Sequence, residues 1–321
     1  MNFFQAIILG LVQALTEYLP VSSSAHIRII GDLMLGSDPG AAFTAIIQIG
    51  TELAVILYFR RDIARILSHW FGSLFGKDGK DLRSRLGAHD RDTQMGWYII
   101  VGTLPIVIAG LVFKNAIETN LRNLWITVTV LVVFGVLLWI FDQRSPQRKT
   151  IGQMTMRDAI VFGIGQMLAL IPGVSRSGGT ITFGRAMGYT REAAVRVSFL
   201  MAIPAVLGAG LLETVSAVKD INACTANPDP ASEACVGMGM FPGWGPTIAA
   251  TVVSFVVGYI IVIAFLKFVS VFSYRAFAIY RILLAVTVAI LLIAHVLQPY
   301  ESSATAALAN LVALTPLAAL A

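Results

Sequence analysis

AIILGLVQALTEYLPVSSSAH, residues 6–26, and AIVFGIGQMLALIPGVSRSGG, residues 159–179, decide the fold of this chain because they are two copies of one pattern. Adding 153 to a position in the first copy gives its partner in the second, and eight of the 21 paired positions are identical. Each copy is a short apolar run with a Gln, a Pro and a turn rich in hydroxyl groups. In integral membrane proteins, interrupted hydrophobic segments at matching places in two halves indicate the functional site.

The composition indicates a polytopic membrane protein. Of 321 residues, 57% are hydrophobic and only 13% are charged, whereas a soluble domain has about 25% charged residues. The net charge of +5 mainly bears on membrane orientation. No basic stripe interleaved with aromatic residues is present, so the sequence excludes nucleic acid as a partner.

Six apolar stretches are long enough to cross a membrane, which takes about 20 residues. These are Ala41–Phe59, Trp97–Phe113, Leu124–Phe141, Val197–Val218, Thr247–Leu266 and Phe277–Leu297. The two copies are too short for this and are interrupted by Pro20, Pro172 and their turns. Backbone that is not helical is tolerated at membrane depth only inside protein or beside water. The sequence therefore predicts an all-α fold with two re-entrant helical hairpins.

The distribution of Lys and Arg predicts the orientation. The stretch Arg60–Arg91 holds eight such residues and Asp142–Arg157 holds four, whereas Asp220–Gly243 holds none. Basic loops lie in the cytoplasm, so the first hairpin enters from outside and the second from the cytoplasm. We expect inverted-topology repeats whose tips meet near the bilayer midplane, with an active site that opens to the extracytoplasmic side. The alternative is a coincidental likeness of two helices that contain Gly and Ser.

The chain is expected to form one membrane domain over residues 1–297, with repeat one at about 1–141 and repeat two at about 157–297. Residues 298–321 form an Ala/Leu-rich tail without evident chemistry. Cys224 and Cys235 lie in one polar loop with no His nearby, which excludes a zinc site. They are either two free thiols or, if the loop lies outside the cell, a disulfide.

The first tip carries polar side chains that are costly in a membrane and therefore indicate function. Gln13 and Glu17 are four residues apart and share a helix face. Glu17 could bind a divalent cation or act as a base, and Gln13 is a further candidate metal ligand. Ser23 and His26 are spaced for a pair of nucleophile and proton acceptor. The alternative for His26 is a structural role as a helix cap or core residue.

The second tip, Pro172–Thr180, has the chemistry of an anion site. Its glycines and serines offer hydrogen-bond donors, and Arg176 matches the geometry of a phosphate. The alternative is that Arg176 forms a structural ion pair with Glu17. The glycine spacing differs from that of a nucleotide P-loop. Because such a site would lie inside the membrane, the sequence predicts a lipid phosphate as substrate. Glu52, in the first long span, is a candidate supporting residue that could pair with Arg176 or bind metal. The alternative is a buried, protonated carboxyl held by hydrogen bonds, and Gln48, one turn earlier on the same face, is likewise either a supporting or a structural residue.

Both tips resemble the signatures of the undecaprenyl-diphosphate phosphatase family of the bacitracin-resistance type. Gln13 to Glu17 with YLPVSSSAH is similar to the first signature, and PGVSRSGGT matches the second in full. The likeness extends through IIQIGTELAV (46–55), VSFLMAIP (197–204) and FAIYRI (277–282). One departure matters: many members carry Glu where this chain has Gln13, so Glu17 has to supply any carboxylate chemistry of this tip.

The resemblance implies an enzyme of the bacterial cytoplasmic (inner) membrane that converts undecaprenyl diphosphate to undecaprenyl phosphate. This activity recycles the lipid carrier for cell-wall synthesis and confers resistance to bacitracin, which competes for the substrate. It implies dependence on Mg²⁺ or Ca²⁺, and the sequence is also compatible with a homo-oligomer. The implied catalytic residues are Glu17, Ser23, His26 and Arg176. The implied substrate-binding residues are Gln13, Ser22, Ser24, Gln166, Ser175, Ser177, Gly178 and Thr180.

Two mechanisms remain open at this point. Ser23 attacks the terminal phosphorus while His26 moves a proton, or His26 activates water while Ser23 holds the phosphate. The competing class of protein is a transporter or flippase of polyprenyl phosphate lipids, which would share the inverted repeats. Such a transporter needs complementary charge but no nucleophile beside a proton acceptor.

Overall fold

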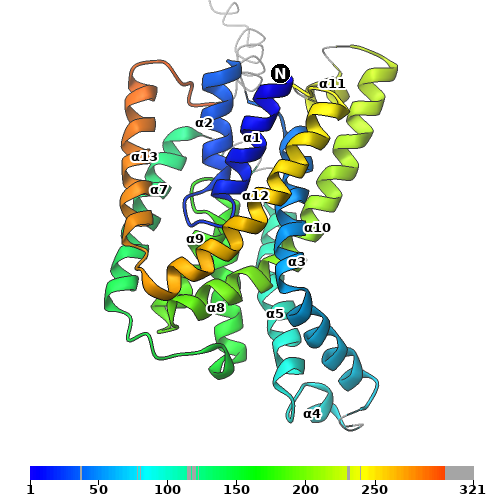
Figure 1. The fold of residues 1–321 in the computed structure, drawn as a ribbon, viewed down its shortest axis with the longest axis vertical. Coiled ribbons are helices and arrows are strands. Elements are labelled where there is room, and N and C mark those ends of the chain that lie inside the picture. Colours follow the sequence, from blue (N-terminus) through cyan, green and yellow to red (C-terminus); the bar gives the residue numbers. More distant parts are fainter. Residues whose placement is uncertain are drawn as a thin grey trace, which may run out of the picture.

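The computed structural model describes residues 1–36, 38–77, 79, 81–113, 117, 121, 123–229, 232–238 and 240–300. Residues 301–321, most of the predicted tail, lie outside this range. The described elements are helices, which confirms the all-α prediction (Figure 1). They are α1 (Phe3–Thr16), α2 (Ser23–Leu35), α3 (Ala41–Leu74), α4 (Leu82–Arg85), α5 (Arg91–Val112), α7 (Leu124–Arg144), η2 (Ile151–Gln153), α8 (Met156–Met167), η3 (Leu168–Leu170), α9 (Arg176–Ala186), α10 (Arg191–Ala226), α11 (Glu233–Met238), α12 (Trp244–Val271) and α13 (Arg275–Ile293).

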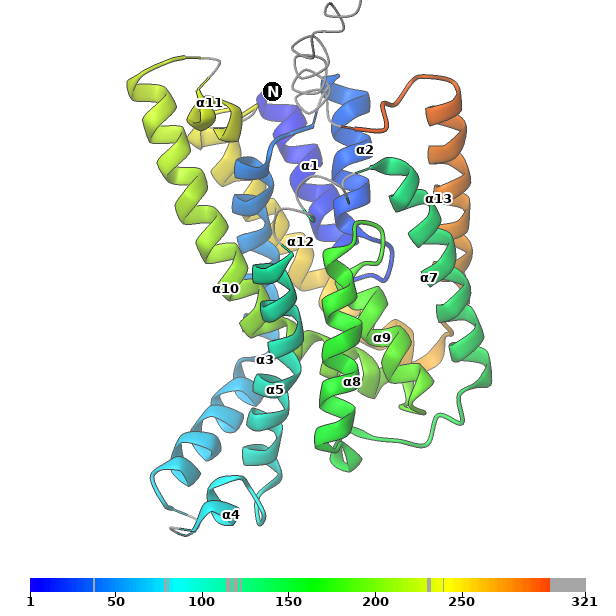
Figure 2. The same ribbon diagram turned by 180° about the vertical axis from the view of Figure 1, so that it is seen from behind.

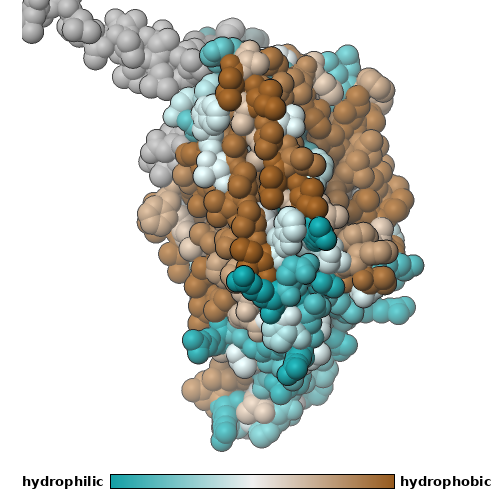
Figure 3. Space-filling model, turned by 90° about the vertical axis from the view of Figure 1, so that its left-hand side faces the viewer, coloured by the Kyte–Doolittle hydropathy of each residue, from teal (hydrophilic) through white to brown (hydrophobic). Residues whose placement is uncertain are grey.

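Six of the described helices are long and apolar enough to cross a membrane, as predicted: α3, α5, α7, α10, α12 and α13. Many of their large apolar side chains point outward; Leu111 is 76% exposed and Leu212 is 72% exposed. On the face drawn in Figure 3, hydrophobic side chains cover most of the upper part and hydrophilic ones gather below. An apolar exterior of this kind is suited to lipid rather than water.

Two of the predicted loops are partly helical. The stretch Arg60–Arg91 was expected to be a loop, but α3 continues to Leu74 and carries Arg60 and Arg65. The reason is that a helix satisfies its own backbone hydrogen bonds and need not end where the apolar run ends. Together with α4 and the start of α5 it forms an arm that extends below the bundle in Figure 1.

The polar stretch Asp220–Gly243 was likewise expected to be a loop. Instead α10 extends to Ala226, and the short α11 follows. Cys224 and Cys235 form a disulfide that joins these two helices, which decides between the two alternatives stated for this pair. Figure 1 places this disulfide-linked end of the molecule opposite the arm.

The two sequence copies form two short helical hairpins, α1–α2 and α8–η3–α9. Each first helix starts at a capping box, at Asn2 and at Thr155. Helix α1 packs on α12 and α8 packs on α5, in each case through a glycine that lets the backbones approach closely. A Cβ on Gly10 would lie 2.5 Å from the carbonyl oxygen of Ala250, and one on Gly163 would lie 2.3 Å from that of Gly102. These two glycines are also 153 positions apart.

The hairpins occupy opposite halves of the bundle. In Figure 1, α1 and α2 lie in the upper half and α8 and α9 in the lower half, and Figure 2 shows their turns facing each other near the middle. The main buried apolar cluster includes Phe162, Phe199 and Phe265 together with Tyr18, which follows α1. This arrangement brings the polar tips together inside an otherwise apolar bundle.

Candidate active site at the two hairpin tips

The two tips share an unusual backbone conformation. Ser22 directly precedes α2 and Ser175 directly precedes α9, with φ angles of 73° and 67°. Residues other than glycine rarely adopt positive φ, and such strain is often found at functional sites. In each tip the hydroxyl of this serine lies close to the hydroxyl two residues later, at 3.3 Å from Ser24 and 3.1 Å from Ser177. The pairing of positions 153 apart therefore extends to conformation.

Three charged side chains from three elements meet between the tips. Nη2 of Arg176, the first residue of α9, donates to Oε1 of Glu17 at 2.7 Å and to Oε1 of Glu52 at 3.2 Å. All three side chains are at most 14% exposed. Glu17 follows the last residue of α1, and Glu52 lies in the first half of α3. The ion pair of Arg176 with Glu17, which the sequence left open as an alternative, is thus present, and two carboxyl groups share one guanidinium group.

Glu17 receives two further hydrogen bonds through its other oxygen. Nε2 of Gln13 donates to Oε2 of Glu17 at 2.9 Å, and the hydroxyl of Ser23 donates to the same oxygen at 2.7 Å. Glu17 is therefore the centre of the site, because it contacts the candidate nucleophile and the arginine at once. This contact also gives the Ser23 hydroxyl a carboxylate that can accept its proton.

His26 does not pair with Ser23 as the sequence had suggested. Its Nδ1 lies 2.7 Å from the carbonyl oxygen of Ser22, and its Nε2 lies 2.6 Å from the hydroxyl of Tyr280 on α13. Since a carbonyl oxygen only accepts, Nδ1 donates to it, and in the neutral imidazole Nε2 is then the acceptor for the tyrosine hydroxyl. The two rings are stacked with their centroids 5.6 Å apart.

An apolar cavity of about 490 Å³ lies beside His26, between α1, α2 and α13. Val12, Leu15, Ile30 and Phe277 are among the side chains that line it. A second cavity of about 390 Å³ lies between α3, α5 and α10, away from the tips. The charged side chains of this second cavity largely pair with each other. The cavity by the tips is the more apolar of the two and therefore suits a lipid chain better.

The remaining predicted residues have varied surroundings. The hydroxyl of Ser177 donates to the carbonyl oxygen of Leu19 at 3.0 Å and so joins the tips. Thr180 is buried and bonds the carbonyl of Arg176, which is a structural role. The amide of Gly178 donates to Ser175 Oγ, so it is not free to cradle an anion as predicted.

Two further predicted site residues, Gln166 and Gln48, are glutamines in the short helix α8 and the long helix α3 of the bundle. Gln166 is fully buried, and neither amide atom has a hydrogen-bond partner among the described residues. Gln13, its counterpart in the first copy, bonds Glu17, whereas position 170 in the second copy is Leu. Gln48 lies one turn before Glu52, and its carbonyl accepts from Thr51.

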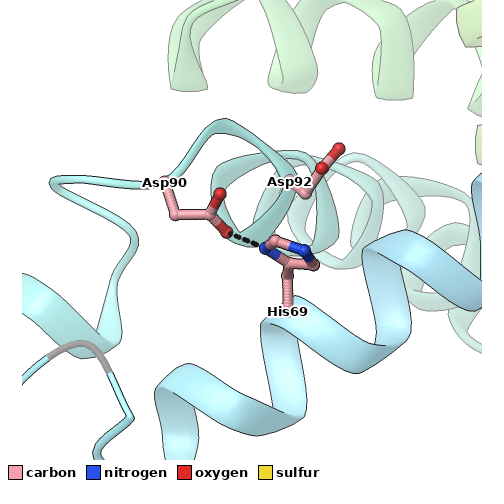
Figure 4. A group of neighbouring side chains, drawn as sticks. All are labelled: His69, Asp90 and Asp92. Carbon is pink, nitrogen blue, oxygen red and sulfur yellow. Dashed lines mark hydrogen bonds and ion pairs between the residues drawn. The ribbon is translucent and has the colours of Figure 1, made fainter.

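Another group of side chains with metal-ligating atoms lies in the arm, outside the tips (Figure 4). His69 Nδ1 is 3.1 Å from Asp90 Oδ2, Asp90 also accepts from the amide and hydroxyl of Thr93, and Asp92 pairs with Arg65. Burial by itself would raise the pKa of Asp90, but the bonds from Thr93 and the nearby His69 outweigh it and lower the pKa. Protein contacts account for this group without a metal.

Two residues of the site were missed by the sequence reasoning, Tyr280 and Arg281. Both lie in the FAIYRI segment of α13, and Arg281 is fully buried behind the tips. The signal was present, because an arginine inside an apolar span indicates function by default.

The comparisons with known proteins agree on one family. A model described as "Bacitracin resistance protein BacA" matches residues 6–287. An undecaprenyl-diphosphatase of Bifidobacterium adolescentis is 77% identical over 306 residues, which are 95% of this chain and 100% of the relative. One of Bifidobacterium animalis subsp. lactis is 70% identical over 94% of this chain and 97% of the relative. One of Renibacterium salmoninarum is 51% identical over 91% of this chain and 96% of the relative.

Proposed function

The chain belongs to the bacitracin resistance protein BacA family, and from this premise we propose that it hydrolyses undecaprenyl diphosphate at the two hairpin tips. The products are undecaprenyl phosphate and inorganic phosphate. The observation that carries this proposal is the contact of Arg176 with Glu17 and Glu52 in the middle of a bundle of membrane-length helices. A buried polar centre inside an apolar exterior fits a substrate that is both a phosphate and a lipid. The names of the relatives support a hydrolase over a transporter or flippase.

The hairpins are re-entrant and form inverted repeats in this proposal. The support is that they lie in opposite halves of the bundle with facing turns, and that their strained serines are 153 positions apart. The protein resides in the cytoplasmic (inner) membrane with the arm, rich in arginine, in the cytoplasm. The disulfide at the opposite end suits the oxidising outer side. The hairpin α1–α2 and the apolar cavity then face the extracytoplasmic side.

The site fits a divalent cation, Mg²⁺ or Ca²⁺. Oε2 of Glu52 is buried and has no hydrogen-bond partner among the described residues, and carboxylate oxygens are preferred ligands of both ions. Glu17 and Glu52 would hold the cation, with the amide oxygen of Gln13 as a further ligand. The bound cation would neutralise charge on the phosphate oxygens. Glu52 thereby offers the second carboxylate that Gln13 does not supply.

Arg176 binds the diphosphate. Its Nη2 holds the two carboxylates, whereas its Nη1 is buried and lacks a hydrogen-bond partner among the described residues. A guanidinium nitrogen in this state is ready to donate to a phosphate oxygen. The prenyl chain occupies the apolar cavity beside His26, where apolar side chains take the place of the surrounding lipid. In this proposal bacitracin competes with the enzyme for the same lipid diphosphate, and one copy of the chain supplies the whole site.

The hydrogen bond from Ser23 to Glu17 favours nucleophilic attack by Ser23. Its Oγ bonds to the terminal phosphorus, the bond to the bridging oxygen breaks, and Glu17 accepts the serine proton. Water then attacks the phosphoserine, and the bond between phosphorus and Ser23 Oγ breaks as Glu17 returns its proton to the serine oxygen. Nε2 of His26, released by Tyr280, accepts the water's proton and passes it to the departing inorganic phosphate. In the other route His26 activates water for direct attack and Ser23 only holds the phosphate. A phosphoserine trapped at Ser23 supports the first route, and full turnover by Ser23→Ala excludes it.

The experiment that tests the function is phosphate release from undecaprenyl diphosphate by purified protein in detergent. It is run with Mg²⁺, with Ca²⁺ and with a chelator. We expect release that depends on the cation. A folded protein that releases no phosphate under any of these conditions would contradict the proposal and direct attention to lipid flux in liposomes.

A further inference from the structure

Arg281 connects the two hairpin tips through backbone carbonyl groups. Its Nη1 donates to the carbonyl oxygens of Pro20 in the first tip and Val174 in the second, both at 3.0 Å. Its Nη2 donates to the carbonyl oxygen of Gly173 at 2.7 Å. The side chain is completely buried. One guanidinium group therefore holds segments that are about 150 residues apart in the sequence.

Among the described residues, Arg281 differs from the other buried arginines because no carboxylate lies beside its guanidinium group. Arg185, equally buried, lies 3.0 Å from a carboxylate oxygen of Asp142, and Arg176 has two carboxylate partners. Within the described part of the chain, Arg281 has no carboxylate within 4.0 Å; oxygen atoms of the backbone surround it. A buried charge without a counter-charge is expensive, so the hydrogen bonds to these carbonyl oxygens have to offset that cost, and the position of the tips is tied to them.

Two glycines make room for this arrangement. A Cβ on Gly178 would lie 2.7 Å from Nη1 of Arg281, closer than real contacts allow. Gly173 has a φ of 99°, a conformation that favours glycine, and its carbonyl is the one that Nη2 contacts. The second tip is therefore shaped around the guanidinium group.

We propose that Arg281 is a positioning residue that locks the two tips in the register in which Arg176 meets Glu17. The inference rests on the proposed function and adds a residue to that site. Arg281 itself does not touch the substrate, because its nitrogens are occupied by carbonyl groups.

The first test compares Arg281→Lys and Arg281→Met with Arg185→Met as a matched loss of a buried arginine. Lysine keeps the charge but lacks the planar fork that reaches both tips. We expect kcat per folded protein to fall about tenfold or more in both Arg281 variants, because small displacements of catalytic groups are costly. Arg185→Met should lower thermal stability and leave kcat within about twofold. Wild-type kcat in folded Arg281→Met would overturn the proposal.

Gly178→Ala provides a second route that removes no polar group. Its methyl should displace the guanidinium and lower kcat about tenfold. In the Arg281→Lys background the shorter side chain vacates this space, so the added methyl should cost clearly less than it does in the wild type. An equal cost in both backgrounds would show that the alanine acts elsewhere and would contradict the lock. If Arg281→Met does not fold, this comparison still tests whether Arg281 locks the two tips.

The tip-to-tip contact can be measured without catalysis. The hydroxyl of Ser177 contacts the backbone carbonyl of Leu19, so residues 19 and 177 are neighbours across the tips. The rate at which Leu19→Cys and Ser177→Cys form a disulfide under mild oxidation reports how closely and how steadily the tips hold these positions together. We expect slower formation, about fivefold or more, when Arg281→Met is added. An unchanged rate would refute positioning even if kcat falls. A wild type that releases no phosphate would contradict the proposed function, whereas the disulfide rate would still test the lock.

Discussion

Glu52→Gln is the substitution that most directly probes the candidate metal site. It keeps the shape of the side chain and removes one of two carboxylates that would hold the cation. Arg176 should stay in place, because its shorter contact, 2.7 Å to Glu17, remains when the 3.2 Å contact to Glu52 is weakened. The expected effect is therefore on metal binding much more than on lipid binding.

The magnitude follows from the loss of one charged ligand. Even the loss of a partner that only orients a metal ligand costs about 10- to 100-fold in affinity, which corresponds to about 1.4–2.7 kcal/mol. We expect the Mg²⁺ concentration for half-maximal activity to rise by at least this factor. The KM for the prenyl diphosphate should change less than about threefold, because Arg176 keeps its place.

The assay is a Mg²⁺ titration of phosphate release, together with direct Mn²⁺ binding measured by electron paramagnetic resonance. Glu192→Gln is the matched control, because this carboxylate is 55% exposed and pairs only loosely with Arg196, at 3.8 Å. It should leave both titrations unchanged. Equal metal affinities of wild type and Glu52→Gln would refute the assignment of Glu52 as a metal ligand.

Three other predictions test separate parts of the structure. Tyr280→Phe removes the hydroxyl that contacts Nε2 of His26 but keeps the stacked ring. We expect kcat to change about three- to tenfold and the pH dependence of kcat to move, because the imidazole loses a hydrogen-bond partner. An unchanged pH dependence would show that Tyr280 does not influence His26 during turnover. Burial would raise the pKa of Asp158, but the hydrogen bonds that it accepts, chiefly from Lys149, outweigh burial and lower this pKa. The ionised carboxylate therefore stabilises the fold above the ordinary pKa of Asp, and this contribution is lost as the pH falls below about 4. Melting temperatures measured against pH should fall less on acidification in Asp158→Asn than in the wild type, and identical curves would contradict this. Gly163→Ala should lower the free energy of unfolding by about 1–3 kcal/mol, because the added Cβ would meet the backbone of α5. An unchanged melting temperature would show that α8 and α5 can move apart at little cost.

Hydrophobicity and repetition predicted much of this fold. Six spans and two short hairpins follow from where apolar runs are long and where Pro20 and Pro172 interrupt them. The ends of the helices could not be predicted in the same way. Helix α3 runs beyond Phe59 because Arg60 and its neighbours continue a helix without being lipophilic, so the apolar run marks the membrane and not the helix.

The candidate site was predicted in its composition but not in its hydrogen bonds. Glu17, Arg176 and Glu52 meet in the structure, an arrangement that the sequence left open as one alternative among several, since opposite charges in an apolar interior have few other partners. Spacing along the chain suggested that Ser23 pairs with His26, but the turn at Ser22 directs the serine to Glu17 and the imidazole to Tyr280. Partners that come from α13 cannot be identified by spacing, because they depend on how distant helices pack.

The central claim is that hydrolysis takes place where the two tips meet, and Arg176 tests it most directly. Phosphate release from undecaprenyl diphosphate should be measured for the wild type, for Arg176→Ala and for Arg196→Ala, an arginine of the second cavity, with equal amounts of folded protein. We predict that Arg176→Ala lowers kcat/KM about 1,000-fold or more, as expected for the loss of an arginine that stabilises the transferred phosphoryl group. Arg196→Ala should remain within about twofold of the wild type. Activity of folded Arg176→Ala close to that of the wild type would contradict the account and move the reaction away from the tips.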